Sequence, residues 1–388
     1  MSCLLAIVLL AADAVTVDAS VRTEGRAYTA TIGGGSAAAL QINALVGLST
    51  TPGEWSFSAA YAPQLLDAPP PDGTGLSVLH GVQLGADYRT SGVGRVFLRD
   101  SLLVGLYDFS PLVANGGTGP PPVLNPRLPV KLLLAYISSN TSLNVEQELS
   151  RRLRLTGTLE YLVAGGSDRV AQNYIPLQRG PQLTANLSWS AERSDKLSLA
   201  LLGSDATLTN GAAVRLATLQ AGWRHELERD LRTDLALGGG FGKSTGPGVQ
   251  VPTSAFPSLS GSITRPLLFR GGHASATLRA NVAPTVDPLT GQIYELGEGQ
   301  AELGWGIDRL VNLVANGGLG RGLSGAAQRG IQLSRAEGFA SVPIGTWAAF
   351  SLGARGAWQK VPGSQSATVP PFEWAVFSFF SIRTQGSL

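Results

Sequence analysis

A glycine-rich stretch, LGGGFGKST at residues 237–245, comes closer than any other segment to a motif with chemistry of its own. The phosphate-binding loop has the pattern G-x-x-x-x-G-K-[ST], in which glycines let backbone amides surround the phosphates. With Gly242, Lys243 and Ser244 aligned to the end of that pattern, its first position holds Leu237 instead of glycine. The segment that follows, GPGVQVPTSAFPSL, contains prolines and has no helical period, so the stretch does not predict a nucleotide site.

The three histidines are the other candidates for chemistry, because a hydrolase needs a histidine held near a serine or a carboxylate. His80 shares the parity of its apolar neighbours, which favours an interfacial position, while His225 and His273 lie beside predicted turns. None has a serine or carboxylate at a recognisable spacing. The single cysteine, Cys3, allows no disulfide and no thiolate metal site in the rest of the chain. We therefore expect no enzyme: no catalytic residues, no metal ligands and no cofactor.

The composition narrows the class of protein. Charged residues make up 14% of the 388, against about 25% in soluble domains. After the first dozen residues no apolar run reaches the ~18 residues of a transmembrane helix. A net charge of +2 is too small to indicate a nucleic-acid partner.

The first twenty residues, MSCLLAIVLLAADAVTVDAS, are similar to a secretory signal peptide. Leu4 to Leu10 form a compact apolar run, and small residues precede a predicted cut after Ala19. No Lys or Arg precedes the apolar run, which is unusual for a signal peptide; a buried N-terminal helix is the alternative. The prediction is a signal peptide over residues 1–19 and a single domain over residues 20–388.

Beyond Ala19 the dominant pattern is alternation of apolar and polar residues. It is clearest in RLRLTGTLEYL from Arg152, in QLTANLSWSAE from Gln182 and in HASATLRANV from His273. Because side chains of a strand point alternately to opposite faces, each segment is predicted to be a strand with one apolar and one polar face. No convincing helical period is present.

Strand length and connections separate the all-β folds. The predicted strands run about 10 to 14 residues, about twice the usual strand length in soluble proteins. Short charged turns, near residues 149–151, 193–195, 227–229 and 307–308, alternate with long connections rich in Gly, Pro and Asn, such as 62–76, 110–129, 163–180 and 359–371. One short side and one long side is typical of an outer-membrane barrel with periplasmic turns and extracellular loops.

Tryptophan placement is an independent observation. Trp55, Trp189, Trp223 and Trp305 each lie within about five residues of a short turn, on the apolar parity of their strands. Such placement predicts an aromatic girdle at a membrane–water boundary, because indole is apolar in body and polar at one tip. The alternative is chance placement in a soluble two-sheet sandwich.

On these features the chain resembles the transmembrane β-barrels of Gram-negative outer membranes, over everything after the predicted signal. The resemblance implies an all-β fold: a single transmembrane antiparallel up-and-down β-barrel located in the outer membrane. We count eighteen strands with both termini periplasmic. Sixteen is the alternative, because Arg22–Ile32 and Arg95–Tyr107 are the least certain strands. The resemblance also implies contacts with outer-membrane lipid and lipopolysaccharide and with the barrel-assembly machinery, and leaves a homo-oligomer open.

Charged residues fall on the polar parities of the predicted strands, which would face the lumen. Mixed charges on an interior wall fit a water-filled channel; the alternative is ion-pair ladders that close the interior. The predicted lumen-lining residues are Glu146, Glu148, Arg152, Arg154, Glu160, Glu192, Arg224, Arg232, Asp234, Arg279, Glu298 and Glu302.

These patterns favour a porin-like channel for passive diffusion of small hydrophilic solutes. The alternatives are a structural or surface-interaction barrel with a filled lumen and, less favoured, an outer-membrane hydrolase. General porins fold one long loop inward as a constriction, and residues 110–129 occupy the corresponding position. Arg127 is the only ionisable residue of that connection. An exposed loop outside the cell is the alternative.

Overall fold

A computed structural model describes most of the chain. The described residues are 15–29, 36–50, 53–68, 75–90, 93–108, 133–227, 231–246, 249–269, 272–287, 291–307, 310–324, 332–360 and 372–387. Nearly all of them lie in β-strands. None of the helices that they form is long and apolar enough to cross a membrane.

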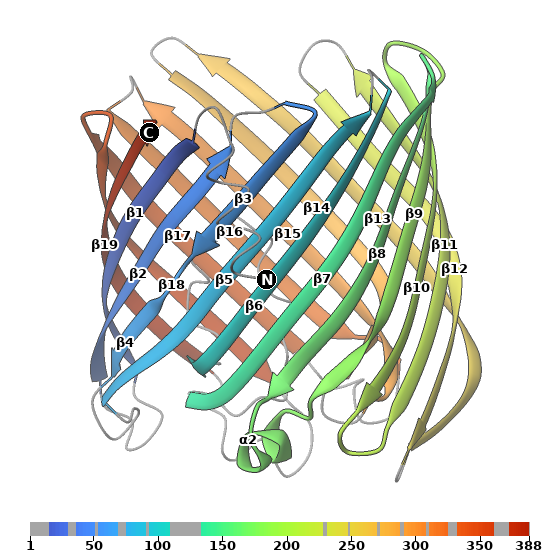
Figure 1. The fold of residues 1–388 in the computed structure, drawn as a ribbon, viewed down its shortest axis with the longest axis horizontal. Coiled ribbons are helices and arrows are strands. Elements are labelled where there is room, and N and C mark those ends of the chain that lie inside the picture. Colours follow the sequence, from blue (N-terminus) through green and yellow to red (C-terminus); the bar gives the residue numbers. More distant parts are fainter. Residues whose placement is uncertain are drawn as a thin grey trace.

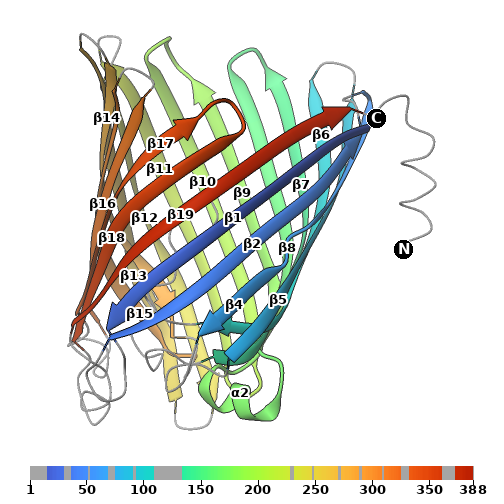
Figure 2. The same ribbon diagram turned by 90° about the vertical axis from the view of Figure 1, so that its left-hand side faces the viewer.

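The strands form one closed antiparallel barrel (Figures 1 and 2). Their bounds are β1 Val15–Thr29, β2 Ser36–Thr50, β3 Trp55–Tyr61, β4 Gln64–Ala68, β5 Gly75–Thr90, β6 Gly94–Asp108, β7 Leu133–Ser150, β8 Leu153–Gly166, β9 Gln178–Ser190, β10 Asp195–Leu208, β11 Ala213–Leu227, β12 Leu231–Gly246, β13 Val249–Phe269, β14 Gly272–Val286, β15 Ile293–Ile307, β16 Val311–Gly322, β17 Gln332–Ile344, β18 Ala348–Lys360 and β19 Phe372–Ser387.

β3 and β4 are one strand interrupted at Ala62 and Pro63, since both pair with β2 and with β5. The barrel therefore has eighteen strand positions, as predicted, rather than the alternative sixteen. Closure is made by β1 and β19, which pair from Thr16 opposite Ser387 to Tyr28 opposite Ala375.

The two ends of the barrel differ as the sequence predicts. Short turns join β2 to β3, β5 to β6, β7 to β8 and the later pairs at one end, where β1 begins and β19 ends (Figure 2). The longer connections lie at the other end, including that between β8 and β9, which contains the short helix α2 (Arg169–Tyr174). Short turns are periplasmic in this class, so the two ends are called periplasmic and extracellular below.

Four details differ from the sequence prediction. Residues 64–68, expected within the long connection 62–76, form β4, because they pair with β2 and β5. The first strand was expected from Arg22 but begins at Val15, because the segment before Arg22 continues the ladder opposite β2. The predicted signal boundary after Ala19 falls within this strand, and residues 1–14 lie outside the described residues. α2 was not predicted; the side chain of Asp168 caps it by accepting the Ala171 N–H at 2.7 Å.

The alternation of apolar and polar residues places their side chains on opposite faces of the barrel wall. On the outer face, Leu201 of β10 lies between Ala185 of β9 and Leu219 of β11, and 41% of its surface is exposed. Its neighbour Ala200 points inward, between Asn186 and Gln220. Large apolar side chains outside and polar ones inside reverse the arrangement of a soluble protein, because the outer face of the barrel meets lipid and the inner face encloses the lumen.

The two faces can be tested at the middle of β10. Leu201→Arg places a charge where the lipid midplane is expected. It should destabilise the folded barrel, lowering its free energy of unfolding by about 2–4 kcal/mol. Ala200→Arg places the same charge in the lumen and should be nearly neutral. Urea titration of folding into lipid vesicles measures both; equal costs would contradict the assignment of faces.

Candidate functional site

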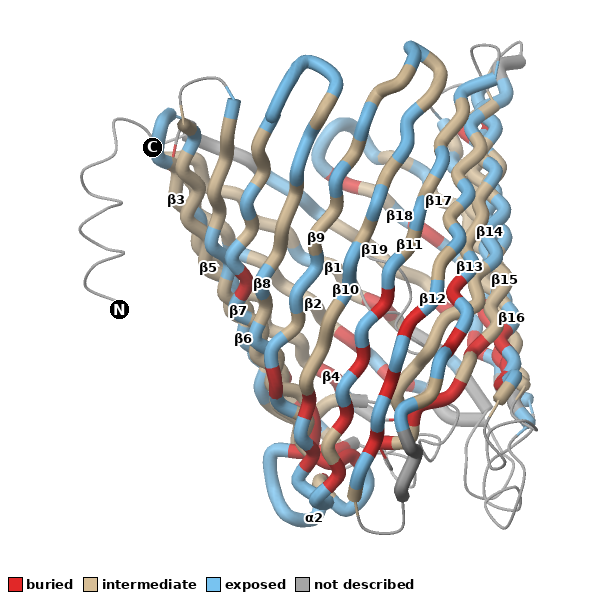
Figure 3. The backbone as a smooth tube through the Cα atoms, turned by 90° about the vertical axis from the view of Figure 1, so that its right-hand side faces the viewer, coloured by how far each residue is buried: buried red, intermediate tan, exposed pale blue. Residues whose placement is uncertain are grey.

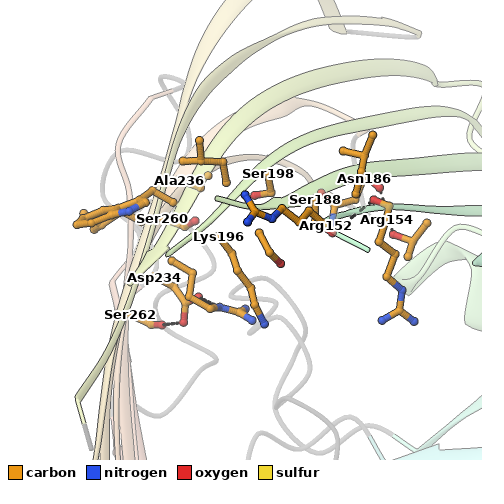
Figure 4. Close-up of a pocket in the computed structure, with 18 of the residues that line it drawn as sticks. Arg152, Arg154, Asn186, Ser188, Lys196, Ser198, Asp234, Ala236, Ser260 and Ser262 are labelled. Carbon is orange, nitrogen blue, oxygen red and sulfur yellow. Dashed lines mark hydrogen bonds and ion pairs between the residues drawn. The ribbon is translucent and has the colours of Figure 1, made fainter. Parts of the chain in front are cut away.

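The inner wall carries a row of small and polar side chains. Strand register places Arg154, Ser188, Ser198, Gly222, Ala236, Ser260 and Asn281 side by side across β8 to β14. All of them line a cavity of about 770 Å³ (Figure 4). Small side chains in this row leave the space open, and their hydroxyl and amide groups make the surface hydrophilic.

Charges of both signs line the same cavity. Six are basic and three are acidic: Arg151, Arg152, Arg154, Lys196, Arg224 and Arg279 against Glu146, Glu148 and Asp234. Arg154 pairs with Glu146 at 2.5 Å, and Asp234 accepts from both Arg224 and Arg232. The excess of basic groups gives this part of the lumen a positive potential, which favours anions.

Seven of the twelve residues predicted to line the lumen lie in this cavity: Glu146, Glu148, Arg152, Arg154, Arg224, Asp234 and Arg279. Four others lie on the inner face by register, with Glu160 opposite Gln182, Arg232 opposite Glu226, Glu298 opposite Asn281 and Glu302 opposite Thr277. Glu192 differs, because it lies in the turn after β9 and no strand face orients it.

A second charged group on the opposite wall was missed from the sequence. Nη2 of Arg355 donates to Oε1 of Glu24 at 2.9 Å, and Nη2 of Arg22 donates to Oε2 of the same carboxylate at 3.2 Å. The two guanidiniums lie 4.1 Å and 3.8 Å from the ring centres of Phe377 and Phe379. Glu24 and Arg355 are almost fully buried, so removing either side chain would leave an unpaired buried charge.

The extracellular mouth is narrowed by the end of the β14–β15 pair, residues 283–287 and 291–296, called the inner hairpin below. Ile293 and Val286 pack on Leu208, Val214 and Phe256, which point inward from β10, β11 and β13. The buried hydroxyl of Ser244 in β12 donates to the carbonyl of Gly291 at 2.6 Å. Figure 3 shows buried residues gathered toward this end of the wall. The hairpin therefore lies inside the barrel instead of continuing its wall.

Proline explains where the hairpin leaves the wall. Among the described residues, the β13–β14 ladder ends at Leu259 opposite Val282. Two positions further toward the extracellular end, the same register would set Pro257 opposite Pro284. Proline has no N–H to donate, so neither strand can supply a ladder hydrogen bond at that pair. Beyond it β13 stays with β12, while β14 turns inward with β15.

One glycine of the phosphate-loop lookalike, Gly242, makes room for this hairpin. The stretch is strand β12, and a Cβ at Gly242 would lie only 2.6 Å from Cδ1 of Ile293. On another part of the mouth, α2 covers the inner face of β7 and β8, where Ala171 and Ile175 pack on Leu134. The predicted constriction over residues 110–129, with Arg127, lies outside the described residues.

The four girdle tryptophans are all exposed, at 56% for Trp55, 46% for Trp189, 40% for Trp223 and 42% for Trp305. Trp189 and Trp223 lie opposite Leu153 and Leu197, on the outer face near the periplasmic turns. Trp55 packs on Tyr88 with ring centres 4.5 Å apart.

The histidines have partners that sequence spacing did not reveal. His80 hydrogen-bonds the Tyr61 hydroxyl at 2.7 Å on the outer face, and His225 contacts Asp195 at 2.8 Å. Ser194 donates to the other oxygen of Asp195 instead of to His225, so this is not the relay of a serine hydrolase. In the part of the chain that the structure describes, no group of His, Cys, Asp or Glu could hold a metal ion.

Solved structures with the same fold are outer-membrane porins. The outer membrane protein OpdK from Pseudomonas aeruginosa has a TM-score of 0.52 at 10% identity, covering 97% of this chain and 100% of its own. OccAB4 from Acinetobacter baumannii gives 0.51 at 9%, covering 97% and 99%. A BenF-like porin from Pseudomonas fluorescens Pf-5 gives 0.52 at 10%, covering 96% and 100%. At such identities the likeness establishes the fold.

Eighteen closed strands around a polar lumen, with this fold likeness, define a porin-like β-barrel protein of the Gram-negative outer membrane. Comparison with proteins of curated function gives no match. Residues 5–388 match the family described as the EpsX exopolysaccharide export family. The chain belongs to that family.

The packing of the inner hairpin can be tested at Gly242. Gly242→Leu should push the hairpin away from β12 and raise the single-channel conductance in a planar bilayer. Gly157→Leu is the control, because an added Cβ there meets only the Thr184 carbonyl at 3.9 Å. Heat-dependent gel migration verifies that both variants are folded. An unchanged conductance in folded Gly242→Leu would show that the hairpin does not limit the pore.

The excess of basic groups in the main cavity predicts a preference for anions. Replacing Arg152 and Arg279 together by Glu should shift the reversal potential in a KCl gradient toward cation selectivity, because both side chains line the main cavity. Arg321→Glu is the control, since register places Arg321 on the outer face beside Gly297 and Gln332. Equal shifts of the reversal potential in the double variant and in Arg321→Glu would contradict the assignment of Arg152 and Arg279 to the lumen.

Proposed function

We propose that the protein is the outer-membrane channel through which an exopolysaccharide leaves the cell. The observation that carries the proposal is membership, over residues 5–388, of a family described by exopolysaccharide export. On this proposal the chain is itself exported through the inner membrane by the signal peptide predicted over residues 1–19. It is then inserted by the barrel-assembly machinery.

The chemistry of the lumen supports this role. A polysaccharide presents hydroxyl groups along its whole length, and it needs a wall that replaces their hydrogen bonds to water without holding them tightly. The row of Ser188, Ser198, Ser260 and Asn281 offers hydroxyl and amide groups, with Arg152 and Lys196 nearby. Repeated weak sites of this kind let a chain slide from one to the next.

The position of the cavity along the barrel axis also fits the export of a polymer. It lies toward the periplasmic end, where Arg152 lies in the β7–β8 turn and Lys196 follows the β9–β10 turn. A polymer entering from the periplasm would meet this basic, hydrated surface first and the inner hairpin last. The hairpin would then limit the width of chain that can leave.

A second candidate is passive diffusion of small hydrophilic solutes. Its support is the fold shared with porins and a lumen that is wide and charged. Neither candidate requires a catalytic group. They differ in whether the natural cargo is a polymer made by the cell or a solute from outside it.

Blocking the lumen distinguishes the candidates. In a strain that lacks the chromosomal copy, the wild-type protein should restore polymer on the cell surface, measured with a polysaccharide-binding dye. A variant with Ser188→Trp and Ser260→Trp should leave the polymer in the periplasm, because two indoles fill the inner row. Leu187→Trp, on the outer face beside Ser188, should restore export. Unchanged surface polymer in the deletion strain, with slower solute uptake, would instead support passive diffusion.

A further inference from the structure

Three charged side chains form a row on the outer face near the extracellular end. Asp205 of β10 lies opposite Arg215 of β11, and Arg215 lies opposite Lys243 of β12. All three face outward: Asp205 and Arg215 share the parity of Leu201 and Leu219, and Lys243 shares that of Phe241. Nε of Arg215 donates to Oδ2 of Asp205 at 3.0 Å, and the two side chains are 76% and 47% exposed.

This row has an unbalanced positive charge. Two cations directly opposite each other on one face of a sheet repel, and one carboxylate offsets only one of them. Asp205 engages Nε of Arg215, so the terminal amino groups of the guanidinium remain as donors. Among the described residues, Lys243 has no ion-pair partner. The arrangement lacks an anion that both cations could share.

An apolar trough lies immediately beside the row, on its periplasmic side. Two positions toward the periplasm, Gly203 and Ala217 lie side by side, with Leu183 beside Gly203 and Phe241 beside Ala217. The two small residues form the floor, and the two large ones form walls that are 45% and 65% exposed. Trough and charged row together line an outward-facing cavity of about 520 Å³.

We infer that this surface binds a phosphorylated acyl lipid of the outer leaflet, such as the lipid anchor of lipopolysaccharide. A phosphate would accept hydrogen bonds from Arg215 and Lys243, and one acyl chain would lie along Gly203 and Ala217. Guanidinium and ammonium groups both bind phosphate through charge-assisted hydrogen bonds. The two cations lie toward the extracellular end and the apolar floor toward the membrane centre. This order matches an outer-leaflet lipid, whose phosphate lies at the surface and whose acyl chain lies deeper.

The lipid is favoured over the exported polymer because the surface faces away from the lumen. The inner side of β11 and β12 carries Leu216 and Gly242, which lie opposite each other in the ladder. A polymer inside the barrel would therefore meet a different surface. The inference does not depend on which cargo the channel carries.

Lipid titration of the full-length barrel in phosphatidylcholine nanodiscs tests the site. The probe is bis-phosphorylated lipid A, measured by displacement of a fluorescent analogue. Arg215→Gln with Lys243→Gln should weaken its binding by about tenfold or more, the effect expected for losing charge-assisted hydrogen bonds. Arg321→Gln, an exposed outer-face arginine near the same end of β16, should leave the affinity unchanged.

Two further measurements separate the phosphate from the acyl chain. Lipid A without phosphates should bind the wild type and the double variant equally weakly. Gly203→Leu fills the trough, where an added Cβ meets nothing within 4 Å, and should weaken lipid A binding without destabilising the barrel. Equal affinity of wild type and double variant for bis-phosphorylated lipid A would overturn the inference. Displacement of lipid A by millimolar inorganic phosphate would overturn the inference of a lipid site and indicate a simple anion site.

Discussion

Every backbone N–H and C=O that enters the hydrocarbon of a membrane must find a partner within the protein, because lipid offers none. The β1–β19 ladder, from Thr16 opposite Ser387 to Tyr28 opposite Ala375, meets this constraint by removing the edges of the sheet. The other properties follow from closure. One face of each strand must be apolar, which frees the inner face to carry the serines, arginines and carboxylates of a hydrated channel.

Much of this architecture could be predicted from the sequence, because a strand with one apolar and one polar face has apolar and polar residues in alternation. QLTANLSWS does so clearly, and it forms most of β9. β6 was an uncertain strand for a physical reason. Asp100 lies on its outer face, held by the Thr141 hydroxyl at 3.0 Å, whereas Phe97 lies on its inner face between Arg95 and Arg99. Local pairing compensates for residues that break the alternation.

What could not be predicted depends on contacts between distant segments. Glu24 and Arg355 are 331 residues apart in the chain yet share a hydrogen bond. The partner of His225 lies 30 residues away, on the neighbouring strand. The inner hairpin needs Gly242 and Ile293 to meet across two intervening strands. The sequence did contain one signal for it, the facing prolines at positions 257 and 284, but this signal is readable only once the register is known.

The separation of β13 from β14 has a consequence for crowding at the cell surface. Above Leu259 the described part of β13 pairs with β12 alone, so its other side has no ladder partner among the described strands. Such an edge is a template on which a neighbouring barrel could extend the sheet and aggregate. Pro257 has no N–H, so this segment offers an incoming strand fewer ladder hydrogen bonds. Pro257, one of the two prolines at which the hairpin leaves the wall, thus also disfavours association along this edge.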